Sequence, residues 1–178
     1  MVAVLRGAGV PTQDDFHAAI TARSDRWFSA CLRILGDAAA AEDAVQEALM
    51  TAWNKRAQFN RESRLETWIH RIAVNAALQA IRKNKPRLYE SLDVEPPSTD
   101  AGPADEQYRD ELDDKLTTAM RHLSDIERAC FVLKHIEEWR HSEIAEELDT
   151  TVEVSKQAVF RAVKKLRGEM TMLKDAIA

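Results

Sequence analysis

The sequence predicts an all-α protein, built as two small helical domains joined by a flexible acidic linker. The chain has 178 residues but only five glycines and five prolines, too few for the many turns of a β-sandwich. Alanine, leucine, glutamate, lysine and arginine, all good helix formers, dominate its composition. One central segment, residues 86–114, holds ten acidic and two basic residues without apolar periodicity. Such a segment cannot bury enough apolar surface to offset the entropy of ordering it.

These observations divide the chain into a disordered tail over residues 1–13, a first domain over 14–85, the acidic linker over 86–114 and a second domain over 115–178. No stretch has the pattern of a secretory signal or the apolar length of a membrane span, so we expect a cytoplasmic protein. Cys31 and Cys130 lack the spacing of a metal site or a disulfide framework and are expected to be small buried apolar residues.

Three helices are predicted in the first domain. The first ends at Gly36, and Asp37 is a plausible cap for the second. A turn through residues 59–61 leads to the third helix, which we expect to start near Thr67. The apolar residues that recur at helical spacing along the three helices are Phe16, Ile20, Trp27, Phe28, Cys31, Leu32 and Leu35, then Ala44, Val45, Ala48, Leu49, Ala52 and Trp53, then Trp68, Ile69, Ile72, Ala73, Ala76, Ala77, Ala80 and Ile81.

The second domain has the pattern of a helix-turn-helix. Ser124 and Glu127 form a capping-box signature at the start of a helix. A short helix over residues 142–148 follows, then a turn over 149–151 and a long basic helix over 152–173. Its apolar residues, on or near the inner side, are Val159, Phe160, Val163 and Leu166. In this arrangement the second helix of the motif enters the DNA major groove.

The charges are sorted along the chain. The net charge of −5 comes from the segment 86–114, whose own net charge is −8. The part before this segment has a net charge of +3, and the part after it has a net charge of zero. Residues 67–87 and 154–168 contain basic but no acidic residues, whereas residues 34–54 contain acidic but no basic ones. Two basic helices and one acidic helix indicate contacts with DNA in two places and with a basic protein in a third.

The first domain resembles region 2 of the extracytoplasmic-function (ECF) sigma factors, a compact branch of the sigma-70 family. The resemblance rests on AEDAVQEALMTAW, followed by Phe59, Leu65 and the stretch WIHRIAVNAA. In that family the acidic second helix docks on the coiled coil of the RNA polymerase β′ subunit, and the matching positions here are Asp43, Gln46 and Glu47. Exposed carboxylates can steer and orient a basic partner.

The same resemblance implies that the loop before the third helix, and that helix itself, melt the promoter minus-ten element and hold a flipped base. The matching candidates are Arg61, Arg64, Trp68, Arg71, Asn75 and Arg82. Asn75 is the candidate reader of the base edge, while Trp68 is either a core anchor or a stacking wedge. Gln79 stands where the family usually has Asp.

The second domain, from Ser124 to Arg167, is similar to sigma region 4, which reads the minus-thirty-five element. Positions matching the family's DNA contacts are Lys134, Lys156, Gln157, Phe160, Arg161 and Lys164. Gln157 and Arg161 can read base edges, whereas the three lysines suit phosphates. The helix departs from the family's Gly-Thr-Val start with Glu153-Val154-Ser155, and Glu153 can complement the helix dipole or accept from a cytosine.

An alternative sigma factor is therefore the leading hypothesis. The resemblance implies core RNA polymerase (β′ and β subunits), promoter DNA and an anti-sigma factor as partners, a linker that passes through the RNA exit channel, and no stable homo-oligomer. We expect no cofactor, metal or catalytic residue, because the histidines form no ligand cluster and no phosphate-cradling glycine loop occurs. A stand-alone helix-turn-helix repressor with a helical sensor domain is the second hypothesis, and an enzyme is a distant third.

Overall fold

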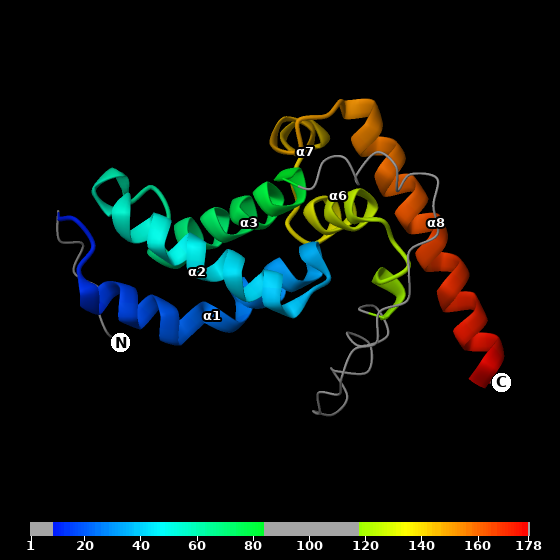
Figure 1. Cartoon of the computed structure of the whole chain (residues 1–178), viewed down its shortest axis with the longest axis horizontal. Coiled ribbons are helices and arrows are strands. Elements are labelled where there is room, and N and C mark those ends of the chain that lie inside the picture. The colour runs from blue at the N-terminus through cyan, green and yellow to red at the C-terminus, as the bar shows by residue number, and fades with distance from the viewer. Residues whose placement is uncertain (1–8, 84–117, 178) are drawn as a thin grey trace.

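The computed structural model describes residues 9–83 and 118–177, and every regular element in these ranges is helical (Figure 1). None of the helices there is long and apolar enough to cross a membrane. The predicted linker, residues 86–114, lies outside the described ranges. The expected all-α fold is confirmed for the described residues.

Three helices pack together in the first domain: α1 (Gln13–Leu35), α2 (Ala38–Asn54) and α3 (Leu65–Lys83), with a short 3-10 turn η1 (Arg56–Gln58) after α2. Each pair among α1, α2 and α3 is in contact. The fully buried residues of α2 are all alanines (Ala41, Ala44, Ala48, Ala52), so its neighbours can approach closely. Trp27 of α1 is fully buried, and its Nε1 donates to the Glu66 carbonyl at 3.2 Å.

Local capping fixes where the first two helices begin and end. Gly36 adopts φ +72° as the C-cap of α1, and its N–H donates to the Leu32 carbonyl at 2.7 Å, a left-handed conformation that glycine adopts without strain. Asp37 then caps α2 by accepting from the Ala40 N–H at 2.8 Å. Both caps follow the predicted positions. Helix α3 starts two residues earlier than expected, at Leu65.

The predicted disordered tail over residues 1–13 is wrong for its second part, and residues 1–8 lie outside the described ranges. Thr12 and Asp15 form a reciprocal capping box at the N-terminus of α1, and these hydrogen bonds from Thr12 lower the pKa of the Asp15 carboxyl. Pro11 is buried, and the Gly9 carbonyl accepts from the Arg61 guanidinium. Residues 9–13 therefore belong to the folded domain, because a helix cap and a long-range hydrogen bond hold them.

The second domain consists of α6 (Asp125–His135), α7 (His141–Glu147) and α8 (Val152–Ile177). The predicted capping box is present at α6, where the Ser124 N–H donates to Glu127 at 3.0 Å and Ser124 Oγ accepts in return at 3.4 Å. Asp149 adopts φ +50° in the turn between α7 and α8, a conformation that aspartate tolerates. The buried face of α8 contains the apolar residues Ala158, Val159, Ala162 and Leu166 together with Ser155.

Two apolar residues lie differently from the prediction. Phe160, placed on or near the inner side of the long helix, is 71% exposed, and Trp53, placed in the core stripe of α2, is 38% exposed. Other side chains already fill the buried faces of both helices, so these aromatic rings stay at the surface.

The two domains pack directly on each other. Helix α6 lies beside α1 and also contacts α3, and one buried apolar cluster extends through both domains (Figure 1). The connection includes two polar contacts between distant parts of the chain: Arg128 reaches the end of α1, and Glu137 pairs with His70 of α3.

Candidate nucleic-acid and partner interfaces

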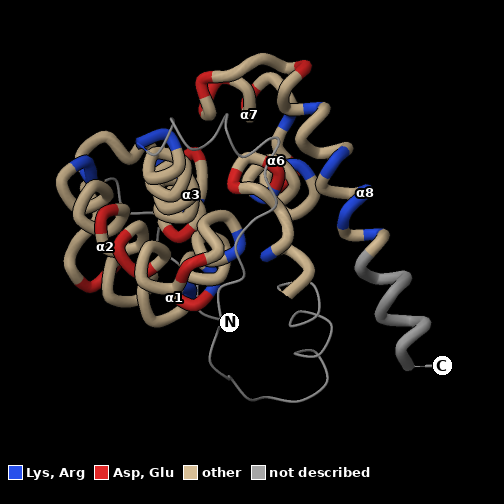
Figure 2. The backbone as a smooth tube through the Cα atoms, turned by 45° about the vertical axis from the view of Figure 1, so that its right-hand side comes forward, with Lys and Arg blue, Asp and Glu red and all other residues tan. Residues whose placement is uncertain are grey.

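Acidic residues recur along α2 (Figure 2). Asp43, Gln46 and Glu47 are all exposed and lie within about one helical turn of each other. Met50 continues the same row and is 67% exposed, and Trp53 follows it. We call Asp43, Gln46, Glu47, Met50 and Trp53 the α2 face.

The apolar half of the α2 face is missing from the sequence prediction. Met50 lies seven residues after Asp43, two helical turns along the same side, and this spacing is the signal that could have identified it. The ring of Trp53 makes an edge contact with the ring of Phe16, and the two ring centroids are 5.2 Å apart. The Arg56 guanidinium lies over the Trp53 ring, 4.1 Å from its centroid. Exposed apolar side chains beside carboxylates are typical of a protein-docking surface.

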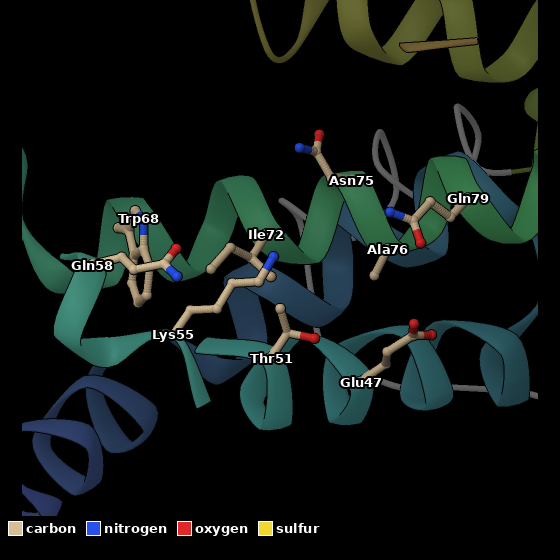
Figure 3. A pocket seen from close by; sticks show the side chains of 9 residues that line it. All are labelled: Glu47, Thr51, Lys55, Gln58, Trp68, Ile72, Asn75, Ala76 and Gln79. Atoms are coloured by element: carbon tan, nitrogen blue, oxygen red, sulfur yellow. The ribbon is translucent and has the colours of Figure 1, made fainter. Parts of the chain in front are cut away.

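A pocket of about 300 Å³ opens between α2 and α3. Its lining comes from both helices and η1: Glu47, Thr51, Lys55, Gln58, Trp68, Ile72, Asn75, Ala76 and Gln79. Figure 3 shows Glu47, Thr51 and Lys55 rising from α2 toward α3, while the Asn75 amide points from α3 away from α2. The wall is mixed, with apolar side chains in the middle and amide, carboxylate and ammonium groups around them.

Asn75 stands out chemically in this lining. Its Oδ1 is buried and has no hydrogen-bond partner among the described residues. A buried acceptor without a partner costs about 1–3 kcal/mol, and a ligand that brings an N–H group would recover that cost. Trp68 packs partly buried against the core and stacks near Phe59, with ring centroids 5.3 Å apart, while also lining the pocket. This position is compatible with either predicted role of Trp68, a core anchor or a stacking surface for a base.

The other minus-ten candidates are distributed around this pocket rather than in it. Arg64 and Arg71 are exposed, and Arg82 is half-buried near the end of α3. Arg61 adopts φ +60°, and its guanidinium donates to the Gly9 carbonyl. A phosphate would have to compete with that hydrogen bond. Gln79, the departure from the family pattern, is exposed and lines the pocket.

The outer face of α8 carries the minus-thirty-five candidates together. Lys156, Gln157, Phe160, Arg161 and Lys164 are all exposed and repeat at helical spacing on the side opposite the buried residues. We call these five residues the α8 face, and Figure 2 shows that Lys and Arg positions recur along this helix. Glu153 is exposed in the first turn of α8, where a carboxylate complements the helix dipole.

Lys134 lies apart from the α8 face, at the end of α6. Its Nζ donates to the Trp139 carbonyl at 3.3 Å, which ties it to the turn before α7. Nearby, Nδ1 of His141 and Oγ of Ser155 share a hydrogen bond of 2.9 Å, whose direction depends on the His141 tautomer. Partial burial, and then the charges of Lys134, Lys156 and His135, lower the pKa of His141.

Both cysteines are buried, as predicted. Burial raises the pKa of each thiol to about 12. In the part of the chain that the structure describes, no three His, Cys, Asp or Glu side chains gather as a metal ion would require.

Comparisons with known proteins agree with this arrangement. Residues 20–87 match the family described as Sigma-70 region 2, and residues 113–166 match Sigma-70, region 4. The chain is 31% identical over 170 residues to the ECF RNA polymerase sigma factor SigW of Bacillus subtilis, covering 89% of this chain and 90% of SigW. It is 30% identical over 172 residues to SigG of Mycobacterium tuberculosis, covering 83% of this chain and 45% of SigG.

A solved structure shows the same fold. The sigma factor RpoE of Bartonella quintana, crystallised with the anti-sigma factor NepR, aligns with a TM-score of 0.59 and 25% identity, over 89% of this chain and 98% of RpoE. Matches to both sigma regions in the right order, and relatives aligned over nearly the full length, place this chain in a known family. It belongs to the ECF sigma factors of the sigma-70 family.

Proposed function

We propose that a base flipped from the promoter minus-ten element binds along α3 at the rim of the pocket, where the Asn75 amide points away from α2, and that the α2 face and the α8 face bind polymerase and the minus-thirty-five element. The unpartnered Oδ1 of Asn75 carries this proposal. As a family member the chain is an alternative sigma factor, which directs core RNA polymerase to its promoters. The cytoplasm, where polymerase works, is its proposed compartment.

The chemistry of the pocket favours a base with an N–H donor at its edge. Oδ1 of Asn75 can accept from the exocyclic amine of cytosine or adenine. Trp68 and Ile72 offer apolar contact to the base plane, which offsets part of the few kcal/mol lost in unstacking. Arg64 and Arg71, exposed beside the pocket, are placed to hold the displaced strand through its phosphates.

Transcription with purified core polymerase tests the pocket. Asn75→Ala should lower initiation at a cognate promoter by about 5- to 150-fold, equal to the roughly 1–3 kcal/mol of one good base contact. Gln13→Ala, which removes an exposed amide at the start of α1, is the matched control and should leave initiation unchanged. Replacing the minus-ten bases one at a time by abasic sites should abolish the effect of Asn75→Ala at one position only. Equal losses at every position would refute the assignment.

The α2 face is proposed to dock on the β′ subunit. Asp43 and Glu47 supply charge for steering a basic partner, and Met50 supplies the apolar contact that usually dominates such interfaces. Asp43→Arg together with Glu47→Arg should abolish core polymerase binding. Asp14→Arg together with Asp25→Arg, an equal charge change on exposed positions of α1, should not. Unchanged binding by the α2 variant would rule out this docking face.

The α8 face is proposed to enter the major groove at the minus-thirty-five element. Arg161 and Gln157 suit base edges, and Phe160, exposed among them, suits a thymine methyl group. Lys156 and Lys164 suit phosphates. Arg161→Ala should relax sequence preference, whereas Lys164→Ala should weaken binding to all promoters alike and reduce its salt dependence.

Control by an anti-sigma factor is also proposed. RpoE of Bartonella quintana, which shares this fold, was solved in complex with one. A pull-down of a tagged copy of this chain from its own cells, compared with the Asp43→Arg/Glu47→Arg variant, would identify such a partner separately from polymerase.

A further inference from the structure

A buried carboxylate connects α6 to the helix that carries the α8 face. Glu127 in α6 is only 1% exposed. Its Oε2 accepts from Nζ of Lys165 in α8 at 2.8 Å and from the Ser124 N–H at 3.0 Å. A buried charge is costly unless an opposite charge and hydrogen bonds compensate it. Lys165 supplies the opposite charge, and the α6 capping box supplies the second hydrogen bond.

Lys165 shares a row of side chains with two members of the α8 face. Gln157, Arg161 and Lys165 follow one another at four-residue spacing, which places them along one side of the helix. All three are exposed, and we call them the α8 row. The first two are the proposed readers of base edges, so spacing alone would make Lys165 the next DNA contact. The ion pair with Glu127 directs its ammonium group to α6 instead.

The neighbouring lysine is placed differently. Lys164 is exposed and makes no ion pair with the residues that the structure describes. Adjacent residues point about 100° apart around a helix, so this pair of lysines presents one cation to solvent and the other to α6. A lysine adds to DNA affinity when it neutralises a phosphate and releases a counterion. Lys164 is available for this contact, whereas the charge of Lys165 is already neutralised by Glu127.

The ion pair also orients α8 on α6, which touch along their lengths. Ser155, Ala158 and Ala162 are buried residues of α8 and are all small. Small side chains form shallow ridges, which fix the rotation of one helix on another less firmly than large side chains do. A charge-assisted hydrogen bond is directional, and here it reaches a carboxylate that the capping box already holds. The contact of Lys165 therefore constrains the rotation of the α8 row.

We propose that Glu127 is a positioning residue for promoter recognition, which holds Lys165 so that the α8 row is fixed in rotation and one positive charge is withheld from the DNA backbone. The proposal rests on the proposed function of the α8 face. Withholding that charge favours specific over general binding, because an additional phosphate contact strengthens binding to every sequence alike.

The salt dependence of promoter binding tests this role. Glu127→Gln keeps an oxygen that can accept from the Ser124 N–H but removes the charge that holds Lys165. We would measure binding of a cognate promoter duplex by holoenzyme assembled from the full-length chain and core polymerase. The slope of log K against log salt concentration should become steeper by about 0.9. Preference for this promoter over one with a scrambled minus-thirty-five element should fall by about 5-fold or more. Glu146→Gln, the same charge change at an exposed position of α7, is the matched control and should change neither readout.

A double variant separates positioning from simple loss of stability. Glu127→Gln together with Lys165→Gln gives two amides that can keep a hydrogen bond between α6 and α8 without either charge. This variant should return the salt slope and the promoter preference to those of the parent. A steeper slope that Lys165→Gln does not reverse would overturn the proposal. So would weaker binding at every salt concentration without a steeper slope, which is the result that destabilisation alone would give.

Arg161→Ala tests the proposed function of the α8 face independently. If Arg161→Ala leaves sequence preference unchanged, the face itself is wrongly assigned, and the positioning role of Glu127 is overturned with it. If Arg161→Ala relaxes sequence preference while Glu127→Gln changes neither the slope nor the preference, only the positioning role is overturned.

Discussion

Replacing Gly36 by alanine tests how tightly the two domains fit. Gly36 has φ +72°, and a Cβ built on it would lie 2.8 Å from Cζ of Arg128. The substitution therefore has two costs. The left-handed backbone costs a non-glycine residue about 1–2 kcal/mol, and the methyl group displaces a buried guanidinium that makes two hydrogen bonds to α1.

The second cost can be estimated from those hydrogen bonds. A hydrogen bond to a charged group contributes about 1.5–3 kcal/mol, and the new methyl group should break at least one of the two. Gly36→Ala should therefore lower the free energy of unfolding by about 2.5–5 kcal/mol in the parent. In an Arg128→Ala background the clash is absent, and only the backbone cost of about 1–2 kcal/mol should remain.

Urea unfolding followed by circular dichroism measures the four free energies of this double-mutant cycle. A coupling of at least about 1.5 kcal/mol between positions 36 and 128 is expected. Equal losses in both backgrounds would mean that the Arg128 guanidinium does not contact Gly36 in solution. That result would refute the packing of the two domains as well as the energetic argument.

Three further predictions concern single side chains. The thiol pKa values of Cys31 and Cys130 are raised to about 12. Both thiols should therefore resist iodoacetamide at pH 8 in the native chain and react once urea unfolds it. Fast labelling of the native chain would contradict their burial. The pKa of His141 is lowered in the folded state. The free energy of unfolding should therefore keep the contribution of His141 above pH 6.5 and lose it as the pH falls below 6.5. His141→Gln should remove this part of the pH dependence in urea titrations. Ser124→Ala should cost about 1 kcal/mol through loss of the α6 cap, and a retained midpoint in thermal unfolding would argue against the capping box.

Local features of the fold could be predicted from the sequence because their causes are local. The Gly36 and Asp37 caps and the Ser124 capping box depend on residues three or four positions apart, and the structure confirms each of them. The same holds for the helix-turn-helix, whose helices and turn lie within one short segment.

The packing of one domain on the other could not be predicted in this way. Arg128 and Ile34 are 94 positions apart, and His70 and Glu137 are 67 apart. A single arginine or glutamate leaves no periodic pattern that would reveal so distant a partner. Phe160 and Trp53 were expected near the core for a related reason, because hydrophobic spacing does not distinguish a ring that packs inside from one left at the surface.

The close fit of Gly36 against Arg128 also limits how such proteins can be recombined. A second domain transplanted from a relative would bring its own side chain at position 128 to the first domain's helix end, and a residue larger than glycine at 36 would force an arginine at 128 to shift. The two positions should therefore change together among homologues. Engineers who exchange promoter-reading modules between sigma factors would need to move both residues as one unit.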